Sequence, residues 1–174
     1  MAGSLIKIQE TTVSSAVSSV TLTGIDSTYD VYIVQYSNLQ IDTDSKFLEI
    51  RYTVSGTADS SSNYDYAFKD LKADTSFGTP NNSNANAIPL DNTGTATGEA
   101  LQGILYLFNF NNSSEYSFHT QETFGVNTNG SLRGRQGGGV LTEAQATDGI
   151  SIGRFADSGT DIDNGRFVLY GLNK

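Results

Sequence analysis

The chain lacks cysteine and tryptophan entirely, and only two of its 174 residues are proline. Without cysteine it can form no disulfide, no thiolate metal site and no cysteine nucleophile. Without tryptophan, any surface that stacks on sugar rings would have to be built from the smaller aromatic residues. A chain of this length can bury roughly 70% of its unfolded surface, so one domain needs no covalent staple.

Basic residues are also scarce: ten lysines and arginines face 19 acidic residues, a net charge of −9. A nucleic-acid binder usually carries a basic patch, so no nucleic-acid partner is expected. No run of 18 apolar residues is present, so no transmembrane helix and no membrane partner are expected. Residues 1–13 alternate apolar and polar side chains without a basic region or a long apolar core, so no signal peptide is expected.

What the chain does contain is typical of β-structure. Val, Ile, Thr, Tyr and Phe fill the apolar segments, which are separated by glycines and by Ser, Thr and Asn tracts. Strands are predicted at residues 5–13, 17–24, 30–39, 47–54, 101–110, 116–124, 149–155 and 166–172. This spacing predicts an all-β fold, a single antiparallel β-sandwich domain over residues 1–174 with jelly-roll-like connections.

Two segments are harder to interpret. Residues 63–72 fit both a helical stripe and an alternating strand, and the strand is favoured because the neighbouring segments are strands. Residues 77–98 lack a clear period and are predicted to be a long surface loop, with Ile88-Pro89-Leu90 as an anchor for its middle.

The only histidine, His119, lies in a strand where alternation places it opposite the face of Tyr116 and Phe118. A catalytic triad needs a nucleophile beside the histidine, and neither such a nucleophile nor a Gly-x-Ser-x-Gly elbow is recognisable. We therefore expect His119 at a surface or interface position. No residue is predicted to be catalytic, and the chain is not expected to be an enzyme.

Three carboxylates, Asp157, Asp161 and Asp163, crowd one loop that ends at Gly165. Such a cluster could hold a hard cation such as calcium, but the residue order does not match an EF-hand loop. Solvated turn carboxylates are the simpler interpretation. No cofactor is therefore predicted, and calcium is the single candidate.

Arg133 and Arg135 lie next to the glycine run at residues 137–139. The run indicates a bulged strand or a close backbone approach, and the arginines could contact an acidic neighbouring subunit. These two interpretations are compatible. Tyr29, Tyr36 and Tyr64 are candidate ligand-facing residues for a sugar, although a core position is expected for most tyrosines.

Three segments resemble small virion structural proteins of marine tailed bacteriophages: residues 22–32, 104–110 leading into 112–116, and 165–172. In such proteins a Gly-Ile-x-Ser-Thr-Tyr turn, here residues 24–29, precedes a strand. A closing strand with Phe-x-Leu-Tyr-Gly corresponds here to residues 167–171, and the third segment is residues 104–110 with the turn that leads to Tyr116. The matches keep their order and spacing over roughly residues 17–172.

The resemblance implies a β-sandwich on the outside of a virion, as a capsid-decoration or tail-fibre protein, and supplies no catalytic residues. Because the chain lacks a long repetitive shaft, it favours a compact decoration, cement or tail-accessory subunit. The alternative is a tail-fibre or receptor-binding module that recognises a carbohydrate, such as a host surface glycan.

The resemblance further implies other virion proteins as partners, a homo-oligomer such as a trimer, and synthesis in the host cytoplasm before incorporation into the virion. The first strand, residues 5–13, is the predicted docking strand, because an exposed strand edge is a template for pairing. Its apolar residues Leu5, Ile6 and Ile8 are predicted assembly contacts, together with Arg133 and Arg135. The loop at residues 77–98 would form the outer surface.

Overall fold

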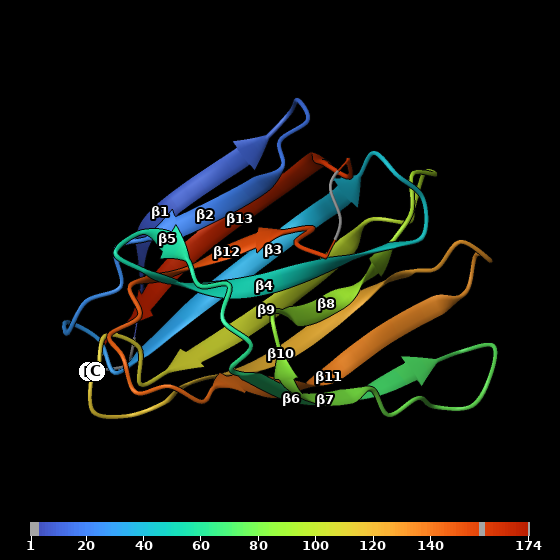
Figure 1. Ribbon diagram of the computed structural model, residues 1–174. Coiled ribbons are helices and arrows are strands. Elements are labelled where there is room, and N and C mark those ends of the chain that lie inside the picture. Colours follow the sequence, from blue (N-terminus) through green and yellow to red (C-terminus); the bar gives the residue numbers. More distant parts are fainter. Residues whose placement is uncertain (1–3, 157–158, 174) are drawn as a thin grey trace.

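The computed structural model describes residues 4–156 and 159–173, and these residues form β-strands connected by turns, without a helix (Figure 1). The strands in chain order are β1 (Leu5–Val13), β2 (Ser19–Thr23), β3 (Val31–Ile41), β4 (Lys46–Val54), β5 (Thr57–Ala58), β6 (Tyr64–Lys72), β7 (Asn81–Ala85), β8 (Ile88–Thr93), β9 (Leu101–Phe108), β10 (Ser117–Val126), β11 (Leu132–Leu141), β12 (Gly149–Gly153) and β13 (Ile162–Leu172).

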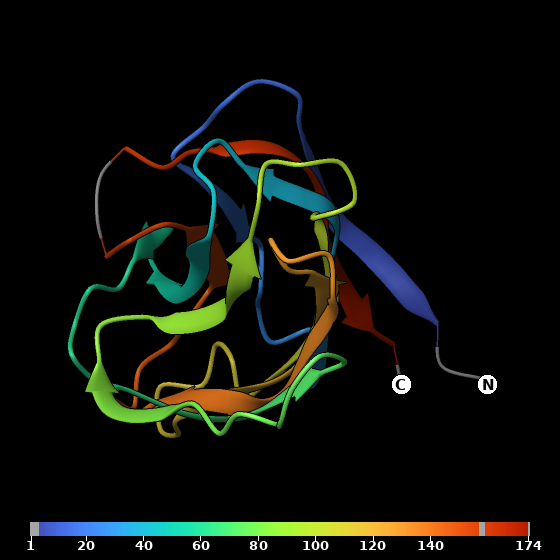
Figure 2. The same ribbon diagram turned by 90° about the vertical axis from the view of Figure 1, so that its right-hand side faces the viewer.

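The strands form two sheets that face each other around a shared interior (Figure 2). The larger sheet has the order β1-β13-β3-β9-β10-β11-β6-β7, and the smaller has the order β2-β12-β4-β5, with β8 also pairing with β4. Every pairing between these strands is antiparallel. The predicted all-β antiparallel sandwich is confirmed.

The connections are of two kinds. From β1 to β4 the chain alternates between the two sheets, as chains do in jelly rolls, whereas β9, β10 and β11 form a meander within the larger sheet. The connection from β9 to β10 spans residues 109–116, and the last four residues before Ser117 include the turn that leads to Tyr116. The ambiguous segment at residues 63–72 is strand β6, as the sequence favoured.

A hydrophobic core fills the space between the sheets. The inward side chains of β3 and β4 form its centre, including Val34, Leu48 and Ile50, and the terminal strand β13 adds Phe167 and Leu169. Strand β3 is apolar on both faces, because Ile33 on the face that points away from the smaller sheet is also buried. Burial of such aliphatic and aromatic side chains contributes about 1.5–3 kcal/mol each to folding.

The prediction of a loop over residues 77–98 is wrong. Strands β7 and β8 lie within it, and β8 pairs with β4 and buries Ile88 and Leu90 completely. The Ile88-Pro89-Leu90 anchor is thus part of the core. Its polar neighbours Asp91 and Thr93 point inward as well, which hides the strand from a search for alternating apolar residues.

Two of the motif segments that are far apart in the sequence meet in the structure. Gly171 of β13 lies directly under the ring of Tyr29, so that a Cβ atom at position 171 would collide with that ring. Tyr32 closes the turn before β3, because its hydroxyl donates to the Asp26 carbonyl (2.7 Å) and accepts from the Asp26 amide (3.0 Å). These motif residues therefore hold the turn against the terminal strand.

Candidate functional site

The centre of the larger sheet exposes aromatic side chains to solvent. Along β10 the buried positions are Ser117, His119, Gln121 and Thr123, whereas Phe118 and Phe124 alternate with them on the outer face. In the neighbouring strand β9, Leu105 and Leu107 are buried and Tyr106 is exposed. Both strands thus turn aromatic rings away from the core.

These outward rings belong to rows that cross the sheet. Val31, Phe108, Phe118 and Val140 lie side by side on four adjacent strands, and Tyr106 lies in the next row between Ile33 and Thr120. We call these seven residues the aromatic stripe. Phe118 retains 41% and Tyr106 38% of its full exposure. The stripe ends at a shallow hollow of about 400 Å³ above Gly138, bordered by Phe118, Val140 and Ala67.

Polar side chains under the stripe are paired inside the sandwich. His119 Nδ1 lies 2.7 Å from the Tyr52 hydroxyl, and Gln121 donates to the Leu90 carbonyl at 2.9 Å. Both contacts join the larger sheet to the smaller one. The prediction of a surface position for His119 is wrong: it is buried, and burial lowers its pKa to about 4. An imidazole with this pKa is neutral at pH 7.

The edge of the larger sheet is formed by β1, which pairs with β13 on one side only (Figure 1). The predicted contact residues Leu5 and Ile6 are exposed, whereas Ile8 packs against the core. Glu10 on the same strand accepts a hydrogen bond from Arg166 of β13 at 2.7 Å. This bond, with a second from Lys7, lowers the pKa of Glu10 to about 2.

Arg133 and Arg135 of β11 are paired within the chain. Arg135 Nε lies 2.8 Å from Asp70 of β6, and Arg133 lies 3.1 Å from Asp70 and 2.9 Å from Asp91 of β8. Burial raises the pKa of Asp91, while both guanidinium groups act against that increase. The four residues, which we call the ionic cluster, link the two sheets.

The expectation that these arginines contact a neighbouring subunit is wrong for Arg135, because its side chain is only 2% exposed and its charge is compensated internally. Arg133 is mostly buried and points into the same cluster. The glycine run beside them is part of the regular strand β11, where Gly138 and Gly139 pair with β10 and β6. A Cβ atom at Gly138 would collide with the His119 carbonyl oxygen, so the close backbone approach is confirmed.

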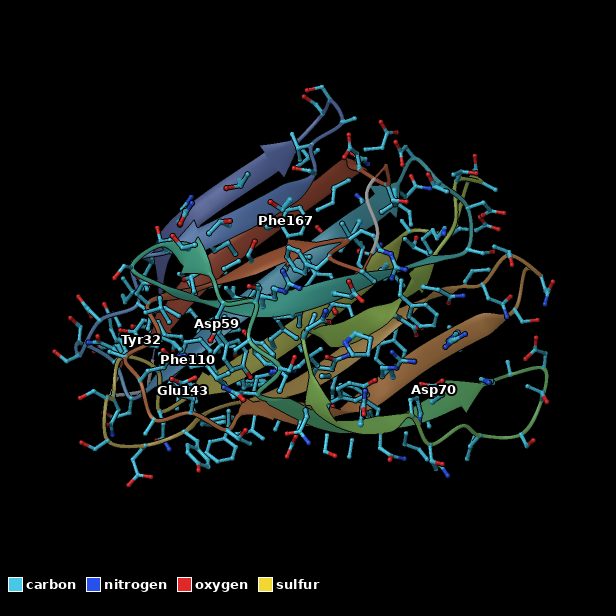
Figure 3. All side chains as sticks on the ribbon, viewed as in Figure 1. Tyr32, Asp59, Asp70, Phe110, Glu143 and Phe167 are labelled. Atoms are coloured by element: carbon cyan, nitrogen blue, oxygen red, sulfur yellow. The ribbon has the colours of Figure 1, made fainter. Side chains whose placement is uncertain are left out.

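A pocket of about 440 Å³ opens over the ionic cluster, between β6 and β7 of the larger sheet and β4 and β8 of the smaller one. Figure 3 shows Asp70 toward this end of the sandwich, far from Tyr32 and Phe110 at the other end. Aromatic, amide and charged side chains surround the opening: Phe47, Glu49, Tyr66, Asn82, Asn86 and Arg154.

The tyrosines predicted to face a ligand lie elsewhere. Tyr36 and Tyr64 are fully buried, so the prediction is wrong for both: the Tyr36 hydroxyl lies 2.6 Å from Thr123 Oγ1, and the Tyr64 hydroxyl contacts the Tyr52 amide at 3.1 Å. Burial raises the pKa of each phenol. Tyr29 is partly exposed beside a second hollow that also contains Asp30 and Asn112.

The predicted acidic cluster is only partly described. Asp157 lies outside the described residues. The Asp161 amide donates to a carboxylate oxygen of Asp42 at 2.9 Å, and Asp163 is exposed on β13. Across residues 4–156 and 159–173, no group of three or more His, Asp or Glu side chains is arranged to hold a metal ion.

Sequence reasoning missed the two acids of the ionic cluster and the pocket residues Tyr66 and Asn82. The signal for Asp70 was its place on the inward face of an otherwise amphipathic strand, since a buried carboxylate requires a cationic partner. For Asn82 no local signal exists, because β7 is a polar edge strand of five residues.

Comparisons of the chain with models of protein families, with curated protein sequences and with solved structures give no significant match. The described part of the chain contains no long apolar helix that could span a membrane. Function is therefore inferred from the residues and their geometry.

Proposed function

We propose that this protein is a non-enzymatic structural subunit of a tailed-phage virion, a capsid-decoration, cement or tail-accessory protein on the particle surface. The observation that carries the proposal is the inverted strand β10, which buries four polar side chains and exposes Phe118 and Phe124. Hydrating an aromatic surface while burying polar groups is unfavourable for an isolated domain. Such an arrangement is useful where a partner covers the rings.

The shape of the surface supports a rigid docking function. The aromatic stripe lies on paired strands, so its rings keep fixed spacings, and the hollow above Gly138 can accept a side chain from a neighbouring virion protein. The open edge of β1, with exposed Leu5 and Ile6, offers backbone groups for strand addition. Copies of the chain would associate around a symmetry axis, for example as a trimer.

The resemblance of residues 24–29, 104–110 and 167–171 to marine phage virion proteins supports the same proposal. The structure gives the first and last of these segments a common role in holding the fold, through the contact between Tyr29 and Gly171.

A charge placed on the aromatic stripe should prevent docking. We expect Phe118→Asp to fold normally, because the side chain is already exposed, and to enter particles at least tenfold less than the unchanged protein in a competition experiment. The measurement is the ratio of the two proteins in purified particles after co-expression during infection.

Removal of residues 1–12 should also abolish incorporation, and circular dichroism would show whether the truncated domain is folded.

The matched control is Phe77→Asp: at 59%, Phe77 is the most exposed large apolar side chain among the described residues, and it borders Phe124 rather than the stripe. Its incorporation should be unchanged. Equal incorporation of Phe118→Asp and the unchanged protein would contradict docking through the stripe, and normal incorporation of the truncation would contradict docking through β1.

A further inference from the structure

The pocket above the ionic cluster offers both hydrogen-bond donors and hydrogen-bond acceptors in fixed positions. Arg133 is held by carboxylates at its Nε and Nη2 atoms, and a guanidinium has five N–H donors, so donors remain for a ligand. Glu49 accepts hydrogen bonds from the amides of residues 155 and 156 and lies 3.5 Å from Arg154. The donors and acceptors are thus positioned before any ligand binds.

The charges around the pocket balance. Arg133, Arg135 and Arg154 line the pocket with Glu49 and Asp70, and the buried Asp91, which pairs with Arg133, makes three charges of each sign. A phosphate or other anion would approach the carboxylates as closely as the guanidinium groups, so the site gives an anion little net attraction. A neutral ligand with hydroxyl groups can use both donors and acceptors without carrying a charge into the pocket.

An aromatic wall completes the site. Tyr66 is partly exposed and stacks on Phe68, with ring centroids 5.3 Å apart and planes 24° from parallel. Phe47, on β4, lines the side of the pocket formed by the smaller sheet. The side chains of Asn82 and Asn86 are exposed at the rim of the pocket. The C–H face of a pyranose ring fits against such a flat surface, and amides at the rim can bind its outer hydroxyl groups.

We propose that this pocket binds a neutral carbohydrate, with a pyranose ring against Tyr66 and its hydroxyl groups on Arg133, Glu49 and Asn82. The pocket is distinct from the aromatic stripe, because it opens between the two sheets whereas the stripe lies on the outer face of the larger sheet; Tyr66 borders both the pocket and the hollow at the end of the stripe. A subunit docked through the stripe would therefore still present the pocket. The volume of about 440 Å³ lies within the range of small-molecule sites.

Saturation-transfer NMR with the full chain tests this proposal, using glucose, galactose, N-acetylglucosamine and inorganic phosphate as separate probes. We expect at least one of the three sugars to bind saturably in the millimolar range and phosphate not to compete. Asn82→Ala and Tyr66→Ala should each weaken sugar binding at least tenfold. Asn82 is exposed on an edge strand, so its variant keeps the fold even if Tyr66→Ala does not.

The matched control is Asn129→Ala, an exposed asparagine in the turn between β10 and β11, which should bind sugar as the unchanged protein does. The proposal is overturned if none of the three sugars binds, if phosphate displaces the sugar, or if Asn82→Ala binds as tightly as Asn129→Ala. None of these results affects the docking proposal, which is tested by incorporation into particles.

Discussion

Replacing Arg135 with methionine is expected to lower the free energy of unfolding by about 3–5 kcal/mol, the usual cost of removing one partner from a buried ion pair. Arg135 bonds to Asp70 at 2.8 Å and lies between the rings of Phe47 and Phe68, at 5.5 and 5.3 Å from their centroids. Without it, Asp70 and Asp91 share a single cation, Arg133, in a largely buried site. Urea unfolding measures the change.

Two further variants separate charge from packing. Asp70→Asn in the Arg135→Met background removes the excess negative charge, so this double variant should recover part of the lost stability. Arg133→Met should cost less than Arg135→Met, because Arg133 is nearer the surface, with 15% of its side chain exposed against 2%. A loss below about 1 kcal/mol for Arg135→Met would show that the cluster does not support the fold.

Acidification from pH 7.5 to 5 is expected to reduce the free energy of unfolding by about 2 kcal/mol through His119 alone, as linkage requires for this pKa shift. The folded-state pKa is about 4 and the ordinary value is 6.5, so the unfolded chain binds the extra proton first as the pH falls. Stability is therefore lost from about pH 6.5 downward, and the loss is complete near pH 4.

The window above pH 5 separates the histidine from the carboxylates whose pKa values are lowered in the folded state. Glu10 and Asp26 have lowered pKa values, so their effect on stability occurs mainly below their ordinary values of 4.5 and 3.8. The raised pKa of Asp91 acts in the opposite direction, since protonation of that residue on acidification favours the folded state. In His119→Gln, urea midpoints at pH 7.5 and 5 should nearly coincide. An unchanged pH dependence in that variant would contradict a buried, neutral His119.

Most strands follow from local patterns. In β4, apolar and polar residues alternate, and in β13 the apolar residues follow one another, with turn residues beside each strand. These strands can therefore be predicted from neighbouring residues alone. The strand β10 also shows period 2, but the pattern does not say which face is buried. Because Phe118 and Phe124 are apolar, the sequence favours burying them, and the structure shows the reverse.

The reason for the inversion is non-local. His119 is accommodated by Tyr52, Gln121 by the Leu90 carbonyl and Thr123 by Tyr36, and each of these partners is between 31 and 87 positions away in the sequence. The same holds for the ionic cluster, where β11 meets acids from β6 and β8. Pairings over such distances depend on the sheet order, which a single sequence does not reveal. The buried Tyr36 and Tyr64 escaped prediction for the same reason.

The most direct test of the proposed function is the number of copies of this protein in purified particles of the phage proposed to encode it, measured by quantitative mass spectrometry against the major capsid protein. The proposal predicts that the chain is a constant component of the virion. Hundreds of copies would place it on the capsid as a decoration or cement subunit, and a few copies in multiples of three or six would place it on the tail. Its absence from purified particles would contradict the proposal.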